Sequence, residues 1–180
     1  MGVRFGRAAL RLLLAGLLAG SAPGAWPETA GASVGAPLPA FSARLLGGGE
    51  VDDASLAGQP ALLVFWRTGC PYCSRFMPGV ERLWRRHGDR GLQVVGISFD
   101  DHGDVREARD QLGLSFALAD GGEAAAGALG VRQVPTWFFV DADGVVRFRG
   151  TSSDPDDPVL ELLAADLLGI DAEDCATALC

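Results

Sequence analysis

The stretch FWRTGCPYCSRFMPGVERLWRRH, residues 65–87, constrains the fold of this chain more than any other. It continues the apolar run 61–66, whose β-branched and aromatic residues are typical of a central strand covered on both faces. Beyond the two cysteines, apolar residues recur at helical spacing and arginines fill the other side, which predicts an amphipathic helix. The sequence therefore places Cys70 and Cys73 where a buried strand passes into a helix. The apolar positions of that helix are Phe76, Val80, Leu83, Trp84 and His87.

The position of the two cysteines indicates redox chemistry. Cys70 would open the helix among unpaired backbone N–H groups, which stabilise a thiolate and make it a nucleophile. Pro71 suits the first helical position because it has no N–H to leave unpaired, and Tyr72 lies between the thiols, where it would control access. Cys73 follows one turn later and could attack a mixed disulfide on Cys70, which would release the bound substrate. We therefore expect Cys70 and Cys73 to catalyse thiol–disulfide exchange.

Other uses of two such cysteines fit the sequence less well. Zinc needs four ligands, and Cys175 and Cys180 lie more than a hundred residues away. Haem attachment needs a histidine after the second cysteine, where Ser74 stands, and a structural disulfide closing so small a loop would stabilise little. Peroxide reduction would call for a threonine at the position of Arg67. We expect no metal site and no cofactor. The alternative function is a copper-handling, metallochaperone-like module that uses the same two thiols, although apart from Met77 the sequence has no histidine or methionine set near them.

The first 25 residues have the layout of a secretory signal peptide. Three arginines precede the apolar run 12–20, and a small-residue, proline-rich stretch follows it. The run is shorter than the roughly 20 residues of a membrane span, although an uncleaved N-terminal anchor stays open as an alternative. Residues 26–39 are rich in glycine, alanine and proline and are interpreted as a linker. We expect a protein of the periplasm or cell envelope, with its folded domain at 40–170 and a cysteine-containing tail at 171–180.

Charge excludes one class of partner. Removing residues 1–25 takes away three arginines and no acid, which leaves 12 basic against 23 acidic residues and a net charge near −11. A chain so acidic would be repelled by nucleic acid, so we expect no nucleic-acid partner.

The rest of the chain predicts alternating strands and helices. Apolar runs at 92–99 and 115–120 are expected to be strands, and segments 103–113 and 123–130 helices. Hairpins are expected at 41–52, around GGG, and at 137–150, around Ala-Asp-Gly. Asp157 and Pro158 would cap and begin a last helix through Leu168, with Gly169 as its stop. This order predicts an α/β fold with a central mixed sheet flanked by helices.

Three motifs in this order resemble the exported thioredoxin-like proteins of the TlpA, ResA and DsbE group. They are GAPLPAFS near the start, FWRTGCPYC followed by Met77-Pro78, and GVRQVPTWFFVDADG, and the resemblance covers residues 34–151. It implies a thioredoxin-like fold with an N-terminal hairpin, and a helix and strand inserted before Pro135, which follows Cys73 by 62 positions. It also implies a cis bond at Pro135, which would face the dithiol, and a backbone at Val134 that pairs with a bound substrate.

The resemblance further implies an activity and partners. Such proteins are thiol-disulfide oxidoreductases that act on exported proteins, and Val134, Pro135, Pro71 and Tyr72 would contact the substrate. The partners would be protein thiols and disulfides, and a membrane redox protein that donates or accepts electrons. We expect this chain to act chiefly as a reductant.

Two positions depart from the patterns of thioredoxins and of this group. Val64 stands where thioredoxins carry a buried aspartate, and Phe76 stands where many TlpA-like proteins carry a glutamate. Neither position can therefore supply a carboxylate that takes the proton of Cys73.

The tail AEDCATALC lies outside the resemblance. Cys175 and Cys180 are five positions apart, so a disulfide between them would require the chain to leave a regular helix. A structural clip, a pair that exchanges with Cys70 and Cys73, and tethers to another chain all remain open for these two residues.

Overall fold

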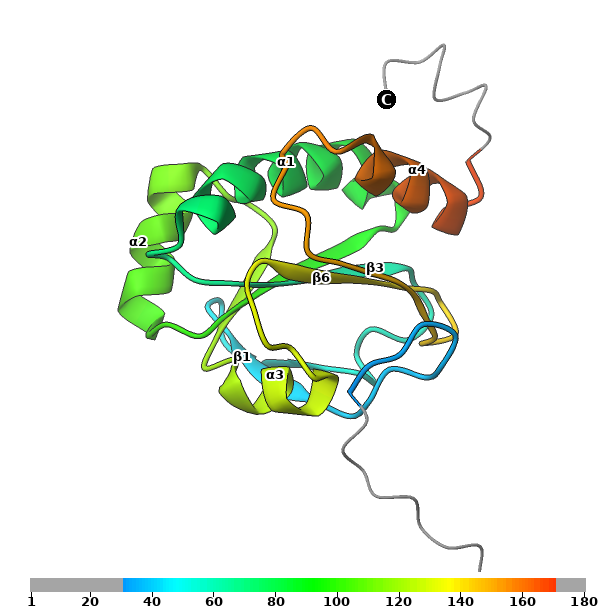
Figure 1. The fold of residues 1–180 in the computed structure, drawn as a ribbon, viewed down its shortest axis with the longest axis horizontal. Helices are drawn as coiled ribbons and strands as arrows, with labels where there is room; N and C mark the ends of the chain where they lie inside the picture. The colour runs from blue at the N-terminus through cyan, green and yellow to red at the C-terminus, as the bar shows by residue number, and fades with distance from the viewer. Residues whose placement is uncertain (1–30, 171–180) are drawn as a thin grey trace, which may run out of the picture.

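The computed structural model describes residues 31–170 and contains one seven-stranded sheet in the order β2-β1-β5-β4-β3-β6-β7 (Figure 1). The three neighbours β3, β4 and β5 run parallel, and every other strand is antiparallel to the strand it joins. The expected mixed sheet is confirmed. The strands are β1 (Ser42–Leu45), β2 (Glu50–Asp52), β3 (Ala61–Trp66), β4 (Gln93–Ser98), β5 (Ala117–Asp120), β6 (Thr136–Val140) and β7 (Val146–Gly150).

The strand that precedes the cysteines lies at the centre of this sheet. β4 and β6 flank β3, and all six of its side chains are fully buried because a core packs on each face of the sheet. Successive side chains of a strand point to opposite faces, so Val64 and Trp66 enter one core and Phe65 the other. The predicted strand 61–66 is therefore correct in its bounds and in its burial on both faces.

Helices cover both faces of the sheet. Core residues of α1, α2 and α4 pack on the face that carries Val64, while those of α3 pack on the opposite face (Figure 1). The interval between Cys73 and Pro135 holds β4, α2, β5 and α3, so the expected additional helix and strand are present. The helices are α1 (Pro71–His87), the short 3-10 helix Gly88–Arg90, α2 (His102–Leu112), α3 (Glu123–Leu129) and α4 (Pro158–Leu167).

The helix boundaries agree closely with the sequence signals. Asp157 caps α4 through its carboxylate, which accepts a hydrogen bond from the N–H of Val159 at 3.0 Å, and Pro158 occupies the first helical position. The helix ends at Leu167, and Gly169 then takes the left-handed conformation at φ +66°. Among residues 31–170, no helix is both long enough and apolar enough to cross a bilayer.

Residues 31–39, which the sequence analysis assigned to a linker, lie against the domain. Ala32 and Leu38 are buried in the core that contains α3. The N–H of Ala32 donates to the carbonyl of Leu129 at 3.0 Å, and that of Leu38 donates to the carbonyl of Gly144 at 2.8 Å. The small residues that suggested a linker allow this close approach of backbone to backbone. The packing extends the folded part of the chain beyond the expected boundary at residue 40.

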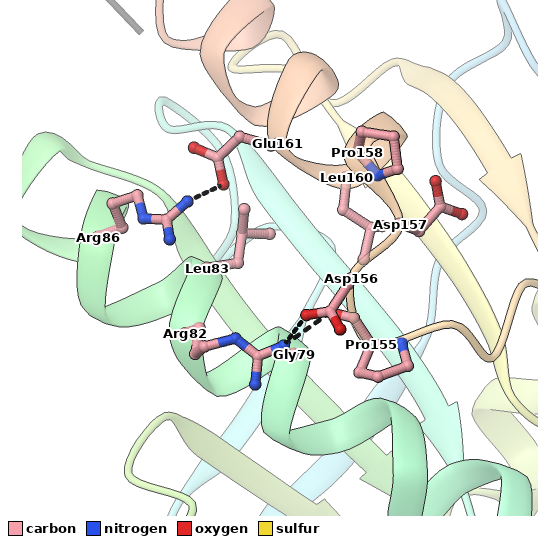
Figure 2. A pocket seen from close by; sticks show the side chains of 10 residues that line it. All are labelled: Gly79, Arg82, Leu83, Arg86, Pro155, Asp156, Asp157, Pro158, Leu160 and Glu161. Carbon is pink, nitrogen blue, oxygen red and sulfur yellow. Dashed lines mark hydrogen bonds and ion pairs between the residues drawn. The ribbon is translucent and has the colours of Figure 1, made fainter. Parts of the chain in front are cut away.

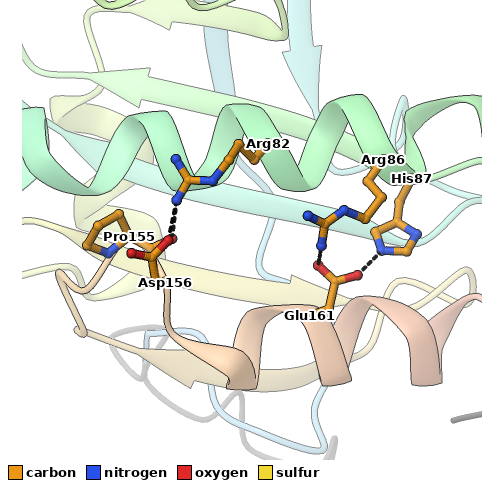
Figure 3. Close-up of polar contacts among 6 residues, drawn as sticks. All are labelled: Arg82, Arg86, His87, Pro155, Asp156 and Glu161. Atoms are coloured by element: carbon orange, nitrogen blue, oxygen red, sulfur yellow. Dashed lines mark hydrogen bonds and ion pairs between the residues drawn. The ribbon is translucent and has the colours of Figure 1, made fainter. Parts of the chain in front are cut away.

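A seam of ion pairs joins α4 and its preceding loop to α1 (Figure 3). Arg82 donates to Asp156 at 2.6 Å, and Arg86 donates to one oxygen of Glu161 at 2.8 Å. The other oxygen of Glu161 bonds Nε2 of His87, which is fully buried, at 2.5 Å. Because the charges along the seam are paired with one another, it acts as a structural contact that holds α4 on the helix of the dithiol.

The contacts of Asp120 predict how the stability of the protein changes at acid pH. Its buried side chain accepts hydrogen bonds from Arg44 at 2.6 and 2.9 Å and bonds Nδ1 of His102 at 2.6 Å. Burial raises the pKa of Asp120, but the bonds from Arg44 and His102 outweigh it and hold the pKa below its ordinary 3.8. The stabilisation is therefore present above about pH 4 and is lost as the pH falls through the lowered value. We expect Asp120→Asn to reduce the free energy of unfolding at pH 7 by about 1–2 kcal/mol.

The measurement is urea unfolding of both proteins between pH 2 and pH 7. The difference between them should begin to shrink below about pH 4, where the unfolded chain takes up a proton on Asp120, and should vanish once the pH has fallen through the lowered pKa of the folded protein. Asp110→Asn is the matched control, since Asp110 pairs with Arg109 at the exposed surface and should change stability by less than about 0.5 kcal/mol. Equal losses in the two variants at pH 7 would show that the Asp120 contacts contribute no more than a surface pair.

Candidate functional site

The dithiol lies where β3 passes into α1. Cys70 is the N-cap of the helix, with extended backbone angles (φ −92°, ψ 113°), and Pro71 takes the first helical position. The sulfur of Cys70 accepts a hydrogen bond from the N–H of Cys73 at 3.3 Å, and its carbonyl accepts one from the N–H of Ser74 at 3.0 Å. The Cys70 sulfur therefore caps the helix, and the expected helix-opening position of this thiol is confirmed. Backbone N–H groups at a helix start can donate hydrogen bonds to a sulfur in this position.

The two thiols differ in their exposure. Cys70 is half-buried, whereas Cys73 is fully buried, and both are free thiols in this structure. The pKa of Cys73 is raised to about 12, mainly by burial and also by the hydrogen bond with Cys70 and the negative charges of Cys70 and Asp100. The backbone N–H of Arg67 acts in the opposite direction. Cys73 therefore keeps its proton while Cys70 is accessible from outside, which suits an attacking thiol and a resolving thiol.

Pro135 lies beside the strand that leads to the dithiol. β6 pairs antiparallel with β3, with Phe65 opposite Thr136, and the same register continued by one residue puts Pro135 next to Trp66. The bond between Val134 and Pro135 is cis, as expected. Val134 is half-buried and packs against both cores.

The surface around Cys70 is open. Pro71 is exposed, and Tyr72 is 61% exposed although it is aromatic. A large apolar side chain next to an accessible thiol provides contact area for a partner.

The two residues that depart from the family patterns lie in the same core as the buried thiol of Cys73. Val64 and Phe76 are fully buried in the same core cluster as Cys73, so this side of the thiol is apolar. A carboxylate reaches the site from elsewhere: Asp100, in the loop after β4, accepts a hydrogen bond from the N–H of Thr68 at 2.6 Å. No motif in the sequence indicates a role for Asp100. The available signal was its position directly after the second buried strand, because neighbouring parallel strands bring the loops at their carboxyl ends together.

Two groups of predicted sites remain untested by the geometry. Cys175 and Cys180 lie outside the described residues 31–170, as does the expected signal peptide. Within residues 31–170, no group of three or more histidine, cysteine, aspartate or glutamate side chains is arranged to hold a metal ion, so nothing in this range favours the copper alternative.

Comparisons with known proteins agree on one family and one fold. The sequence profile of the AhpC/TSA family matches residues 34–149. The thiol-disulfide oxidoreductase ResA of Bacillus anthracis is 31% identical over 115 residues, which are 63% of this chain and 66% of that protein. The thiol:disulfide interchange protein DsbE of Yersinia pestis is 34% identical over 124 residues, 66% of this chain and 64% of that protein. The chain thus spans slightly less than two thirds of the length of these relatives.

A solved structure matches the whole domain. A Chlorobium tepidum protein described as a thiol:disulfide interchange protein DsbE superposes with a TM-score of 0.71 at 26% identity, covering 77% of this chain and 99% of that chain. The thioredoxin-like fold expected from the sequence is confirmed by this match.

Proposed function

The chain belongs to the AhpC/TSA family, and from this premise we propose that it is an exported thiol-disulfide oxidoreductase. One observation carries the proposal. An accessible Cys70 caps the start of α1, while Cys73, one turn away, is fully buried and donates its backbone N–H to the Cys70 sulfur. A dithiol in this arrangement can exchange electrons with a protein disulfide without any cofactor. The names of the relatives, thiol-disulfide oxidoreductase and thiol:disulfide interchange protein, support the same chemistry.

The reaction follows from the two environments. The Cys70 thiolate attacks one sulfur of a substrate disulfide, which forms a mixed disulfide and releases the other substrate sulfur as a thiolate. Cys73 then loses its proton and attacks the Cys70 sulfur, so the second substrate sulfur leaves and a Cys70–Cys73 disulfide forms. Two electrons pass to the substrate, whose two sulfurs take up the proton released by Cys73 and one proton from solvent. Running the same steps backwards oxidises a substrate dithiol.

The proposed substrates are extended segments of exported proteins. Val134 and Pro135 precede β6, and we assign the Val134 backbone to pairing with a bound segment, with Pro71 and Tyr72 contacting it from the helix start. Main-chain pairing gives affinity with little sequence preference, which suits an enzyme that must accept different disulfides. A membrane redox protein would regenerate the dithiol.

We propose that the protein works as a reductant in the periplasm or cell envelope. The high pKa of Cys73 supports this direction, because the reduced form then lacks the second thiolate charge that would stabilise it. Residues 1–25, as a signal peptide or retained anchor, support export. Cys175 and Cys180 are proposed to form a second disulfide that clips the tail.

A redox titration tests the function and its direction. The full chain is equilibrated in glutathione buffers between about −150 and −320 mV, alkylated, and analysed by mass spectrometry for each cysteine pair. We expect Cys70 and Cys73 to form a reversible disulfide with a midpoint below about −250 mV, close to the roughly −270 mV of thioredoxin. A midpoint above about −220 mV would contradict a reductant, and the absence of any Cys70–Cys73 disulfide would contradict the function itself.

A further inference from the structure

Asp100 and the dithiol lie close together because two strands pair in parallel. Trp66, the last residue of β3, is the partner of Ser98, the last residue of β4. The loop that leads to Cys70 and the loop that carries Asp100 therefore leave the same edge of the sheet. The N–H of Phe99 donates to the carbonyl of Trp66 at 3.4 Å and joins the two loops where they begin.

The Asp100 carboxylate fixes the turn that precedes Cys70. One oxygen accepts hydrogen bonds from the N–H of Thr68 at 2.6 Å and from the hydroxyl of Ser98 at 3.1 Å. The other oxygen lies 3.7 Å from the guanidinium of Arg67, and the Asp100 side chain is only 18% exposed. The carbonyl of Arg67 in turn accepts a hydrogen bond from the N–H of Cys70 at 3.3 Å. Asp100 thus holds two of the three residues that connect β3 to Cys70.

The same carboxylate acts on Cys73 through its charge. After burial and the Cys70 sulfur, the negative charge of Asp100 is a further cause that raises the pKa of Cys73. Fully buried apolar side chains, Val64 and Phe76, stand at the two positions where the sequence analysis looked for a carboxylate.

The other charged groups near this site do not replace Asp100. The guanidinium of Arg67 pairs with Asp100 and lies over the ring of Phe99, 4.8 Å from its centre. On α2, Asp104 and Glu107 line a hollow beside Thr68 and are exposed, so solvent screens their charges.

We propose that Asp100 is a positioning residue of the dithiol, which holds the turn before Cys70 and acts on Cys73 through its negative charge. The inference rests on the proposed exchange function. In the reduced protein Cys73 stays protonated, so Cys70 is the nucleophile. After Cys70 has formed a mixed disulfide, Cys73 gives its proton to solvent or to the released substrate thiolate, and its attack closes the protein disulfide. Asp100 slows this second attack and so prolongs the life of the mixed disulfide.

Both steps can be measured with 5,5′-dithiobis(2-nitrobenzoate), a symmetrical disulfide. Attack by Cys70 releases one thionitrobenzoate, and the later attack by Cys73 releases the second, so stopped-flow absorbance gives two rates. The parent is the full chain with Cys175→Ser and Cys180→Ser. Asp100→Asn removes the charge but keeps an oxygen that can accept from Thr68, whereas Asp100→Ala removes both. Asp101→Asn is the matched control, because Asp101 is an exposed neighbour that makes no side-chain cap bond.

Between pH 5 and 9 we expect Asp100→Asn to accelerate the second release by about 2- to 3-fold, because it removes a negative charge that disfavours the Cys73 thiolate but is the smallest of the causes that raise the Cys73 pKa. The rate of the first release by Asp100→Asn should stay within about twofold of the parent rate, because asparagine can still accept the hydrogen bond from Thr68. Asp100→Ala loses this bond, so its first release should be slower. Asp101→Asn should match the parent in both. If Asp100→Asn and Asp101→Asn have the same second rate, or if Asp100→Ala leaves the first rate unchanged, the inference is wrong. A parent that never releases the second thionitrobenzoate would instead overturn the proposed function.

Discussion

Replacing Cys70 by serine is expected to lower thiol–disulfide exchange by at least about a thousandfold, because the reaction loses its nucleophile. The serine hydroxyl would occupy the same N-cap position and could accept the same bond from the N–H of Cys73, so the helix should still form. The activity should be lost without a loss of stability. Reduction of insulin disulfides by the full chain, supplied with dithiothreitol, measures the rate, and urea unfolding measures the stability.

Cys73→Ser is the matched variant for this experiment. Cys70 can still attack, but no buried thiol remains to resolve the product, so turnover should fall while a mixed disulfide with the substrate accumulates. Non-reducing electrophoresis would show this adduct in Cys73→Ser and none in Cys70→Ser. Both variants also carry Cys175→Ser and Cys180→Ser, so that the tail cannot supply a thiol. Full activity in Cys70→Ser, or adducts formed equally in both variants, would remove Cys70 from its assigned role.

Gly79→Ala is expected to destabilise the protein by about 2–3 kcal/mol, although alanine favours a helix. Gly79 lies on the face of α1 that meets the loop before α4 (Figure 2). A Cβ there would lie 2.8 Å from the Cα of Pro155 and closer still to its carbonyl oxygen. Backbone atoms cannot rotate away as a side chain can, so the loop would have to move and the seam between α1 and α4 would loosen.

Gly103→Ala is the control for helix propensity. Gly103 lies inside α2 with nothing within 4 Å of an added Cβ, so alanine there should stabilise the protein by about 0.5–1 kcal/mol. Urea unfolding of the parent and both variants gives the two differences with opposite signs. If Gly79→Ala were as stable as Gly103→Ala, the close approach of Pro155 to α1 would be refuted.

Short-range patterns were enough to predict the elements and the dithiol. The apolar run 61–66, the helical stripe after Cys73 and the turn signals of both hairpins depend on neighbours within a few residues, and each element appears where these signals put it. The same holds for Cys70 as N-cap, because a helix start is defined by its own first turn. The cis bond at Pro135 followed from the resemblance to a known family.

Contacts between distant segments could not be predicted in this way. Small residues and prolines at 31–39 indicate a flexible segment whether or not a surface is available to bind it. In this fold the backbone at Leu129 and Gly144 binds it. Asp100 follows Thr68 by 32 positions and becomes its hydrogen-bond partner because β3 and β4 pair in parallel. Periodicity specifies which face of an element is buried, but the identity of the element that covers it depends on long-range packing, which no local pattern contains. A short sequence motif therefore indicates the proposed nucleophile, Cys70. The position of the Asp100 carboxylate depends on the tertiary fold.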